Sequence, residues 1–304
     1  MTISDVKSGP TDFGSARDAL SKILDQLRGE PSRTWSIIIT VYGDAIVPRG
    51  GSVWLGTLLN FFNALEISDG VVRTAMSRLA ADGWLERNRV GRNSFYRLTD
   101  KGAETFREAT RHIYNPRTPP WHGQFEMLLP DNGPDLDLLR AALERSGFGV
   151  PVPGVWIAPV GTPIPPEAAT AKRLKAGGDG DTNRVLAARS WPLAETSDAY
   201  RQFSAAFEPL HQALVAGGRL TDLEAMIARI LLIHQYRRIV LRDPILPREI
   251  LPNDWPGSAA RALCADIYGC VLAASERWLD QNAIDESGAC PPASADLLNR
   301  FERP

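Results

Sequence analysis

The chain of 304 residues is poor in cysteine and histidine and contains no long hydrophobic run. Its three cysteines, Cys264, Cys270 and Cys290, are too few for a disulfide framework, so we expect a reducing cytoplasm as its compartment. The four histidines are scattered without the spacing of zinc ligands, and we expect neither a metal nor a cofactor. No apolar stretch approaches the roughly 20 residues that span a bilayer, which predicts no membrane contact.

The start of the chain also lacks the apolar core of a secretory signal. We therefore interpret residues 1–30 as a mobile leader. The remaining composition, 44% hydrophobic and 23% charged, is typical of a globular protein. At roughly 100–150 residues per domain, the length predicts two or three domains.

The net charge of -2 hides an uneven distribution along the chain. Residues 31–117 carry 12 Lys and Arg against 8 Asp and Glu, a net charge of +4, whereas residues 118–304 are acidic. A basic segment is a pointer to an anionic partner such as nucleic acid, although ordinary surface variation explains the charge equally well.

Two helices are predicted in the basic segment. Val53–Leu65 has apolar residues at a helical period, and Ser68 is placed as an N-cap for a second helix over Asp69–Ala81. That second helix should bury one face and expose the other. The run before them, Trp35–Ile46, fits either a strand or a buried helix.

A hairpin follows, because Trp84–Val90 and Asn93–Thr99 are extended runs that flank Gly91-Arg92. Helix, turn, helix and basic hairpin is the order of a winged helix-turn-helix, in which the second helix enters the major groove of DNA. The exposed side chains of that helix would contact bases or phosphates, and those of the hairpin would contact the backbone. These predicted contact residues are Arg73, Thr74, Ser77 and Arg78 on the helix and Arg87, Arg89 and Arg92 on the hairpin. The alternative is an ordinary domain with solvated arginines.

Three prolines in Asn115–Pro120 mark a linker. Beyond it, alternating elements predict a ferredoxin-like α+β domain. Its expected strands are Trp121–Leu129, Val155–Pro159 and Arg184–Ala188, and its expected helices are Asp135–Ser146 and Glu167–Ala176. The close carboxylates Asp131, Asp135 and Asp137 are better explained as helix caps than as metal ligands.

Two blocks of the sequence resemble the PaaX family of transcriptional repressors. The first runs from Tyr42-Gly43-Asp44 through Val53-Trp54-Leu55-Gly56 and Val72-Arg73-Thr74-Ala75 to Ser94-Phe95-Tyr96. The second contains Tyr236-Arg237-Arg238, Leu241-Arg242-Asp243-Pro244 and Trp255. The resemblance covers about residues 35–280 and includes neither the leader nor the tail after about 285.

The resemblance implies a repressor of aromatic-acid, phenylacetate-type catabolic genes that is released from DNA by an acyl-CoA such as phenylacetyl-CoA. It also implies a homodimer on a palindromic operator and no enzymatic activity. The expected fold class is α+β multidomain. The predicted domains are a winged helix-turn-helix at 31–115, a ferredoxin-like domain at 119–192 and an all-α C-terminal domain at 193–304.

An acyl-CoA effector needs cations for its phosphates and an apolar site for its acyl group. The apolar helix Asp222–Val240 becomes basic at its end, so Tyr236, Arg237 and Arg238 are the predicted effector-binding residues. The alternative is that these arginines only cap the helix. We expect Arg242–Pro256, rich in proline, to be an ordered wrap over the core, anchored by Trp255.

Two other functions stay open at this point. An enzyme acting on an acyl-CoA or a nucleic acid would need a nucleophile or metal site, and none is visible in the sequence. Turnover of an acyl-CoA that is lost on mutating His122 or His234 would support this alternative. A winged helix can also bind another protein, in which case binding would be insensitive to salt.

Overall fold

The computed structural model describes residues 13–28, 34–130 and 136–301. The chain divides into two compact units. Unit 1 comprises residues 1–110, 203–236 and 260–304, and unit 2 comprises residues 111–202 and 237–259. The three predicted domains stay a prediction. Among the described helices, none has the length and hydropathy to cross a bilayer.

The N-terminal part of unit 1 is built on three helical segments. Helix α2 spans Thr34–Val41 and continues as a π-helical turn, η2, over Tyr42–Ile46 and a short 3-10 helix, η3, over Val47–Arg49. The ambiguous run is therefore a helix, since its apolar residues are buried at a helical spacing. Helix α4, Asp69–Ala81, follows as predicted. Helix α3, Leu55–Asn63, is shorter than the predicted Val53–Leu65, because Val53 and Trp54 lie in a strand.

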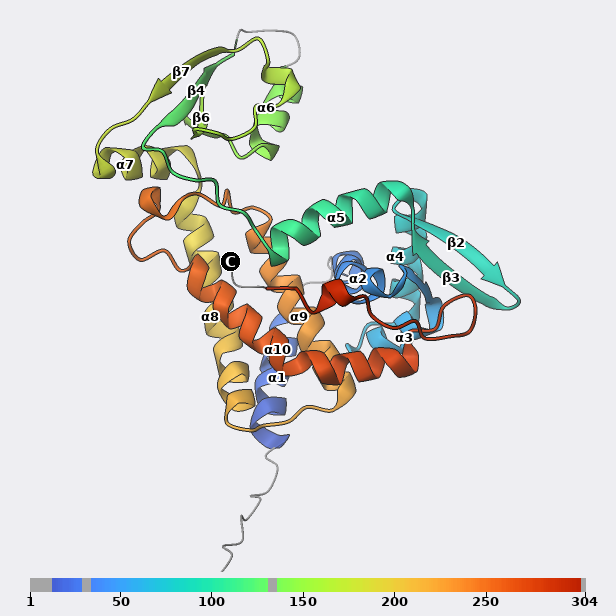
Figure 1. The fold of residues 1–304 in the computed structure, drawn as a ribbon. Coiled ribbons are helices and arrows are strands. Elements are labelled where there is room, and N and C mark those ends of the chain that lie inside the picture. Colours follow the sequence, from blue (N-terminus) through green and yellow to red (C-terminus); the bar gives the residue numbers. More distant parts are fainter. Residues whose placement is uncertain (1–12, 29–33, 131–135, 302–304) are drawn as a thin grey trace, which may run out of the picture. The chain divides into compact units, whose positions relative to one another are not determined.

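The predicted hairpin is present as β2, Leu85–Val90, and β3, Asn93–Leu98. A short strand, β1, Ser52–Trp54, completes an antiparallel sheet of order β1-β3-β2, in which Val53 is opposite Tyr96. The end of the hairpin extends well beyond α4 (Figure 1), and its turn needs the positive φ of Gly91, 61°. Helix α5, Asp100–Tyr114, begins directly after the sheet.

One close approach fixes the hairpin to α5. A Cβ added at Gly102 would lie 2.6 Å from the carbonyl oxygen of Trp84, a backbone atom that cannot move aside easily. We expect Gly102→Ala to destabilise unit 1 by about 1–3 kcal/mol, because overpacking forces the backbone to shift. Gly269→Ala is the matched control, since nothing lies within 4 Å of its Cβ position and alanine favours a helix. Equal unfolding midpoints of the two variants in urea would contradict the close approach.

Helices complete unit 1. Helix α1, Phe13–Arg28, buries Ala16, Leu20 and Ile23, so the prediction of a mobile leader is wrong for these residues. Their spacing by three and four residues forms an apolar face that needs a partner. Arg17 Nε lies 2.7 Å from Glu224 Oε1 at the start of α9, which ties α1 to that helix.

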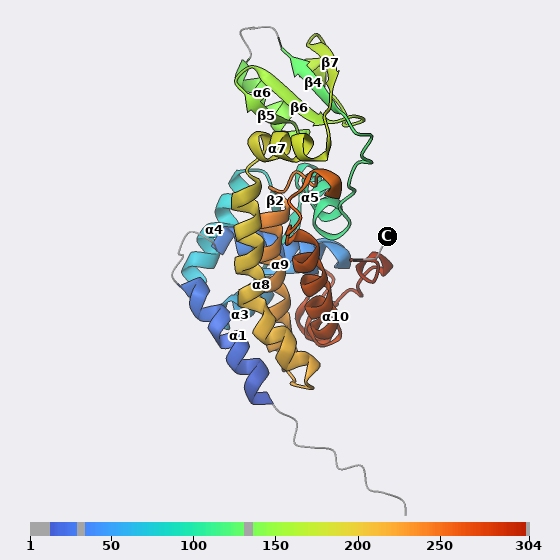
Figure 2. The same cartoon turned by 90° about the vertical axis from the view of Figure 1, so that its left-hand side faces the viewer.

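The three long helices are α8, Leu193–Val215, α9, Asp222–Val240, and α10, Gly257–Asn282. Helices α8 and α9 run side by side in both views (Figures 1 and 2). The middle of α9 is buried all round, which agrees with its nearly continuous apolar sequence. This part of the chain is helical, as predicted.

Unit 2 contains a four-stranded antiparallel sheet of order β5-β6-β4-β7. Its strands are β4, Phe125–Leu129, β5, Gly149–Val152, β6, Val155–Pro159, and β7, Lys172–Ala176. Helix α6, Leu136–Arg145, connects β4 to β5, and β6 lies between those two strands, which is the split β-α-β arrangement.

Two predictions for this region are wrong. Glu167–Ala176 was expected to be a helix, but only the short 3-10 helix η4, Pro166–Ala168, forms before β7, which pairs along the edge of β4. Arg184–Ala188 was expected to be a strand but lies in helix α7, Gly180–Ser190. The side chain of Asp179 accepts a hydrogen bond of 2.7 Å from the Thr182 amide and so caps that helix.

The segment Arg242–Pro256 is ordered, as predicted. Leu246, Ile250 and Leu251 are buried in the hydrophobic core of unit 2. The Trp255 ring packs edge-on against Tyr200 at a centroid distance of 6.0 Å. The segment is thus part of the hydrophobic core of unit 2 and is not an exposed loop.

Candidate nucleic-acid interface

Helix α4 has one buried and one exposed face. Val72, Met76 and Leu79 are buried, and Ala75 on the same face is half-buried. The four predicted DNA-contacting residues of this helix, Arg73, Thr74, Ser77 and Arg78, are all exposed. Ser68 stands at the N-cap with an extended backbone, but its side chain makes no capping hydrogen bond.

The exposed side chains of α4 make weak or local interactions within the protein. Arg73 has a long contact of 3.9 Å to Asp69, one turn away, and such exposed pairs contribute little. The Thr74 hydroxyl donates to the carbonyl of Gly70 at 2.8 Å, which leaves its oxygen able to accept a second bond. The face therefore offers cationic and hydroxyl groups to an outside partner.

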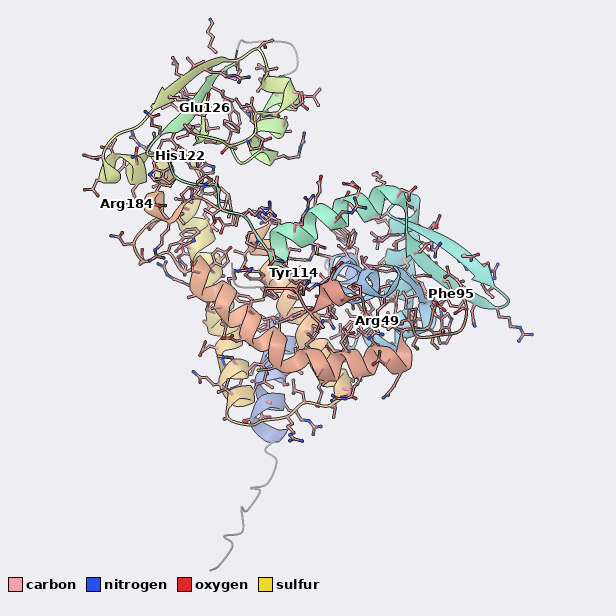
Figure 3. The ribbon with its side chains drawn as sticks, viewed as in Figure 1. Arg49, Phe95, Tyr114, His122, Glu126 and Arg184 are labelled. Carbon is pink, nitrogen blue, oxygen red and sulfur yellow. The ribbon has the colours of Figure 1, made fainter. Side chains whose placement is uncertain are left out.

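The hairpin presents its arginines in the same way. Arg87, Arg89 and Arg92 are exposed, and every residue of β2 after Leu85 is exposed. Arg87 donates to the Ser94 hydroxyl at 2.7 Å, which fixes its side chain across the two strands. In the middle of β3, Phe95 and Tyr96 are buried, so the strands are anchored there while the tip is solvated. Figure 3 labels Phe95.

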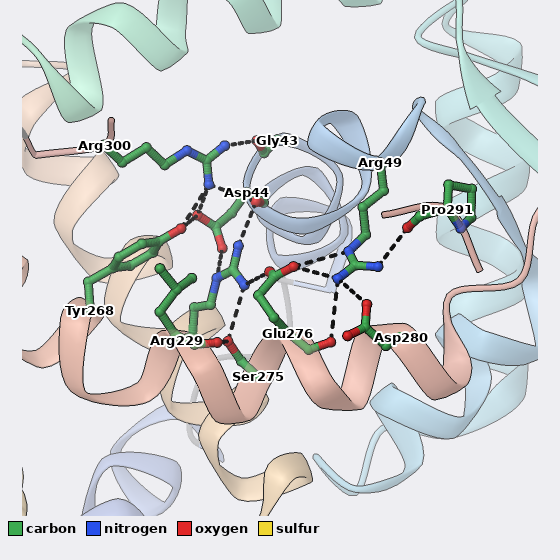
Figure 4. A network of polar contacts seen from close by, with 11 residues as sticks. Gly43, Asp44, Arg49, Arg229, Tyr268, Ser275, Glu276, Asp280, Pro291 and Arg300 are labelled. Atoms are coloured by element: carbon green, nitrogen blue, oxygen red, sulfur yellow. Dashed lines mark hydrogen bonds and ion pairs between the residues drawn. The ribbon is translucent and has the colours of Figure 1, made fainter. Parts of the chain in front are cut away.

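Unit 1 also contains a buried network of charged groups, which is shown in Figure 4. Arg229 of α9 is fully buried, and its Nε donates to Asp44 Oδ2 at 2.5 Å. It also donates to the Ser275 hydroxyl at 3.1 Å and to Glu276 of α10. Burial opposes the charge, but Asp44, with Tyr268 and Glu276, raises the pKa of Arg229 above its ordinary value. The guanidinium therefore stays charged in the core.

A second arginine extends this network toward the sheet. Arg49, which is buried, donates to Glu276 Oε2 at 2.5 Å and to Asp280 Oδ1 at 2.8 Å. Its Nη1 donates to the carbonyl of Pro291 at 2.7 Å. Together Arg49 and Arg229 connect the turn between α2 and α3 to helix α10.

The segment after α10 is bonded along the same elements. The Trp54 amide donates to the carbonyl of Ile284 at 2.8 Å, and the Ser294 amide donates to that of Pro48 at 2.7 Å. Further on, Arg300 Nη1 lies 2.7 Å from Asp44 Oδ1. We call residues 284–301 the C-terminal strap. No sequence pattern predicts this role of the strap, but a charged residue inside an apolar run is a signal that could have found Arg229 and Asp44.

The three predicted effector-binding residues are consecutive on α9, and their role stays a prediction. The Tyr236 side chain is buried in unit 1, where its ring packs on Phe203 at 5.6 Å, whereas Arg237 and Arg238 belong to unit 2. Burial and the charge of Arg238 lower the pKa of Arg237 to about 10, while Tyr114 (Figure 3) opposes that shift. Two adjacent cations, one of them partly desolvated, favour a bound anion.

The two histidines that could serve an enzyme lie in different units. His122 is exposed on unit 2 (Figure 3), and His234 is buried in unit 1, 3.2 Å from the Thr40 hydroxyl. Residues 131–135 are not described, so the expectation for Asp131 and Asp135 lies outside the described part. Within that part, no three His, Cys, Asp or Glu side chains cluster as metal ligands would.

The geometry defines a class of protein: an α+β chain with a helix–helix–hairpin segment and a helical C-terminal part. Residues 33–102 match the family described as PaaX-like protein, and residues 191–281 match the PaaX-like protein C-terminal domain. The chain belongs to the PaaX-like family. It is 35% identical over 286 residues to the transcriptional repressor PaaX of Escherichia coli, across 88% of this chain and 89% of that protein.

A solved structure shares the fold. An uncharacterized protein of Mycobacterium tuberculosis aligns with a TM-score of 0.50 and 24% sequence identity. The alignment covers 86% of this chain and 97% of that one.

Proposed function

We propose that the chain is a transcriptional repressor that binds double-stranded DNA through a winged helix-turn-helix made of α2, α3, α4 and the hairpin. The observation that carries the proposal is the exposed face of α4, with Arg73, Thr74, Ser77 and Arg78 opposite a buried apolar face. The repressor that is 35% identical to this chain supports it.

In this proposal α4 lies in the major groove, whose width accepts a helix. Its hydroxyl and guanidinium groups contact base edges and phosphates, and the exposed Arg87, Arg89 and Arg92 of the hairpin bind the neighbouring backbone. A two-fold dimer would place two copies of α4 about 34 Å apart, matching the half-sites of a palindromic operator. A repressor of this kind works in the cytoplasm and needs no cofactor.

We further propose that the regulated genes serve aromatic-acid catabolism and that an acyl-CoA, such as phenylacetyl-CoA, releases the protein from DNA. Arg237 and Arg238 would bind phosphates of the ligand, because guanidinium groups pair well with phosphate. Release requires only that the ligand prefer the state with lower DNA affinity, and a 100-fold preference corresponds to roughly 2.7 kcal/mol of coupling.

The test is fluorescence anisotropy of labelled DNA from the region upstream of the chain's own gene, with the full-length protein. We expect binding that phenylacetyl-CoA reverses and that free CoA and free phenylacetate leave intact. Binding that no acyl-CoA disturbs would contradict the effector but keep the repressor. The absence of any DNA binding at low salt would contradict the repressor itself.

The arginine pair gives a sharper prediction about the effector. With Arg238→Ala, we expect release from DNA to need about ten- to a hundredfold more phenylacetyl-CoA, since a hydrogen bond to a charged group contributes about 1.5–3 kcal/mol. Arg248, also in unit 2 and exposed, supplies the control Arg248→Ala. Equal release midpoints for the parent and Arg238→Ala would show that the phosphates bind elsewhere.

A further inference from the structure

The C-terminal strap ends with an aromatic ring inside a cage. The Phe301 ring lies 5.4 Å from the Tyr268 ring and 6.2 Å from the Tyr236 ring, between centroids. The guanidinium carbon of Arg261 is 5.4 Å from the centroid of Phe301, within range of a cation–π interaction. We call Tyr236, Tyr268 and Arg261 the aryl cage. All of these residues belong to unit 1.

The Phe301 side chain makes favourable contacts with the cage, but the backbone of this residue is strained. Its φ is 60°, in the left-handed region that bulky residues rarely adopt. Phe301 is half-buried. A ring held by aromatic contacts on a strained backbone can be replaced by an equivalent ring that brings no strain.

The preceding residue connects the cage to the segment between α2 and α3. Arg300 Nη1 donates to Asp44 Oδ1 and to the Asp44 carbonyl, each at 2.7 Å, and to the Tyr268 hydroxyl at 2.9 Å. Its Nη2 donates to the Gly43 carbonyl at 3.1 Å. Because Arg300 and Phe301 are consecutive, a backbone movement that carries the Phe301 ring out of the cage also withdraws the Arg300 guanidinium from these acceptors.

The cage also holds an unused hydrogen-bond donor. Arg261 Nη1 is buried and has no hydrogen-bond partner among the described residues. A buried donor of this kind favours a ligand that supplies an acceptor oxygen. The Phe301 side chain is a benzyl group, which fills the aromatic part of the cage but has no oxygen for Arg261.

We propose that the aryl cage is a binding site for an arylacyl group, which displaces Phe301 and offers its carbonyl oxygen to Arg261. Displacement withdraws Arg300 from Gly43 and Asp44 and loosens η2, the π-helical turn between α2 and α3. The protein therefore binds DNA in the state in which the strap is bound. This regulation rests on the proposed function, whereas the cage and its ligand do not. The strap is thus an internal competitor of the ligand, and it lowers the ligand's apparent affinity.

Strap displacement can be measured directly by hydrogen–deuterium exchange of the full-length protein. The amides of Leu297, Leu298 and Arg300 donate to carbonyls within the strap, so they are protected while it is bound. With saturating phenylacetyl-CoA, we expect their exchange to accelerate about fivefold or more, because local opening exposes these amides. Free CoA should leave the rate unchanged, and free phenylacetate tests whether the aryl group alone is sufficient.

Variants of the strap test the competition by calorimetry without DNA. We expect Phe301→Ala to bind phenylacetyl-CoA at least about fivefold more tightly than the parent, since the competitor is gone. Phe301→Leu keeps an apolar side chain and should be intermediate, which guards against a folding defect. Leu298→Ala is the control, because Leu298 is 76% exposed in the same strap. Arg261→Met should bind the ligand more weakly than the parent.

Several outcomes would overturn the inference. Ligand binding with unchanged strap exchange would place the site elsewhere, as would equal affinities of Phe301→Ala, Phe301→Leu and Leu298→Ala. A lack of binding to both the parent and Phe301→Ala would show that the cage takes no arylacyl group. Strap displacement in a protein that binds no DNA would support the cage and contradict the repressor, so the two failures are distinguishable.

Discussion

Asp44→Ala is expected to lower the free energy of unfolding of unit 1 by about 3–5 kcal/mol, because removing one partner leaves buried charge uncompensated. Asp44 is 1% exposed, and its carboxylate accepts from Arg229, Tyr268 and Arg300. The fully buried Arg229 would keep Glu276 but would lose its bonds to the Asp44 carboxylate. The large expected effect thus comes from the charges left behind rather than from the carboxylate itself.

The matched control is a pair of similar length at the surface of the same unit. Arg277 Nη2 lies 2.7 Å from Asp222 Oδ1, but the Arg277 side chain is 58% exposed. We expect Asp222→Ala to cost about 1 kcal/mol or less, since solvent screens such pairs. Urea denaturation of both variants gives the comparison. If Asp44→Ala cost no more than Asp222→Ala, Asp44 would not be at the centre of a buried network.

The second large effect concerns DNA recognition by α4. We expect Arg73→Ala to weaken binding to the operator and to relax the preference at one base position by about 1–3 kcal/mol, the usual discrimination of a side chain that contacts a base edge. Arg73 is exposed, and its one ion pair, to Asp69, is long, so the substitution should leave folding intact. Anisotropy with a set of single-base variants of the operator measures this change.

A hairpin arginine should behave differently. Arg89 is exposed on β2 and is predicted to bind phosphate, so Arg89→Ala should weaken all duplexes about equally. The slope of log affinity against log salt should become shallower by about 1, because one fewer counterion is released. If Arg73→Ala and Arg89→Ala both bound DNA as tightly as the parent, neither α4 nor the hairpin would be the reading surface.

Local patterns predicted the elements that depend on periodicity. The helix over Asp69–Ala81 and the hairpin at Gly91 follow from the apolar spacing and from turn chemistry, which act within a few residues. Helix α1 carried the same signal in Ala16, Leu20 and Ile23, but the polar residues around them obscured it.

The errors in unit 2 have a physical cause. Lys172–Ala176 is mostly charged and buries no apolar face, because β7 is an edge strand with mostly exposed side chains. Its strand conformation is imposed by pairing with β4, whose partner residues lie more than 40 positions earlier. Pairing over such a distance overrides local propensity.

The buried network and the aryl cage depend on contacts over longer distances still. Asp44 and Arg229 are 185 residues apart, and Asp44 and Arg300 are 256 apart. No spacing rule connects such residues. Consecutive residues on a helix point about 100° apart, so Tyr236 and Arg237 face different surroundings, and their role in binding an effector stays a prediction.

The proposed function depends on sequence-specific binding of DNA through the exposed arginines of α4 and the hairpin. The most direct measurement is the anisotropy of its own upstream DNA and of a scrambled duplex across a range of salt concentrations. We expect the upstream DNA to bind at least about 10³-fold more tightly, with an affinity that falls steeply with salt. Equal affinities for the two duplexes, or an affinity independent of salt, would contradict the proposed function.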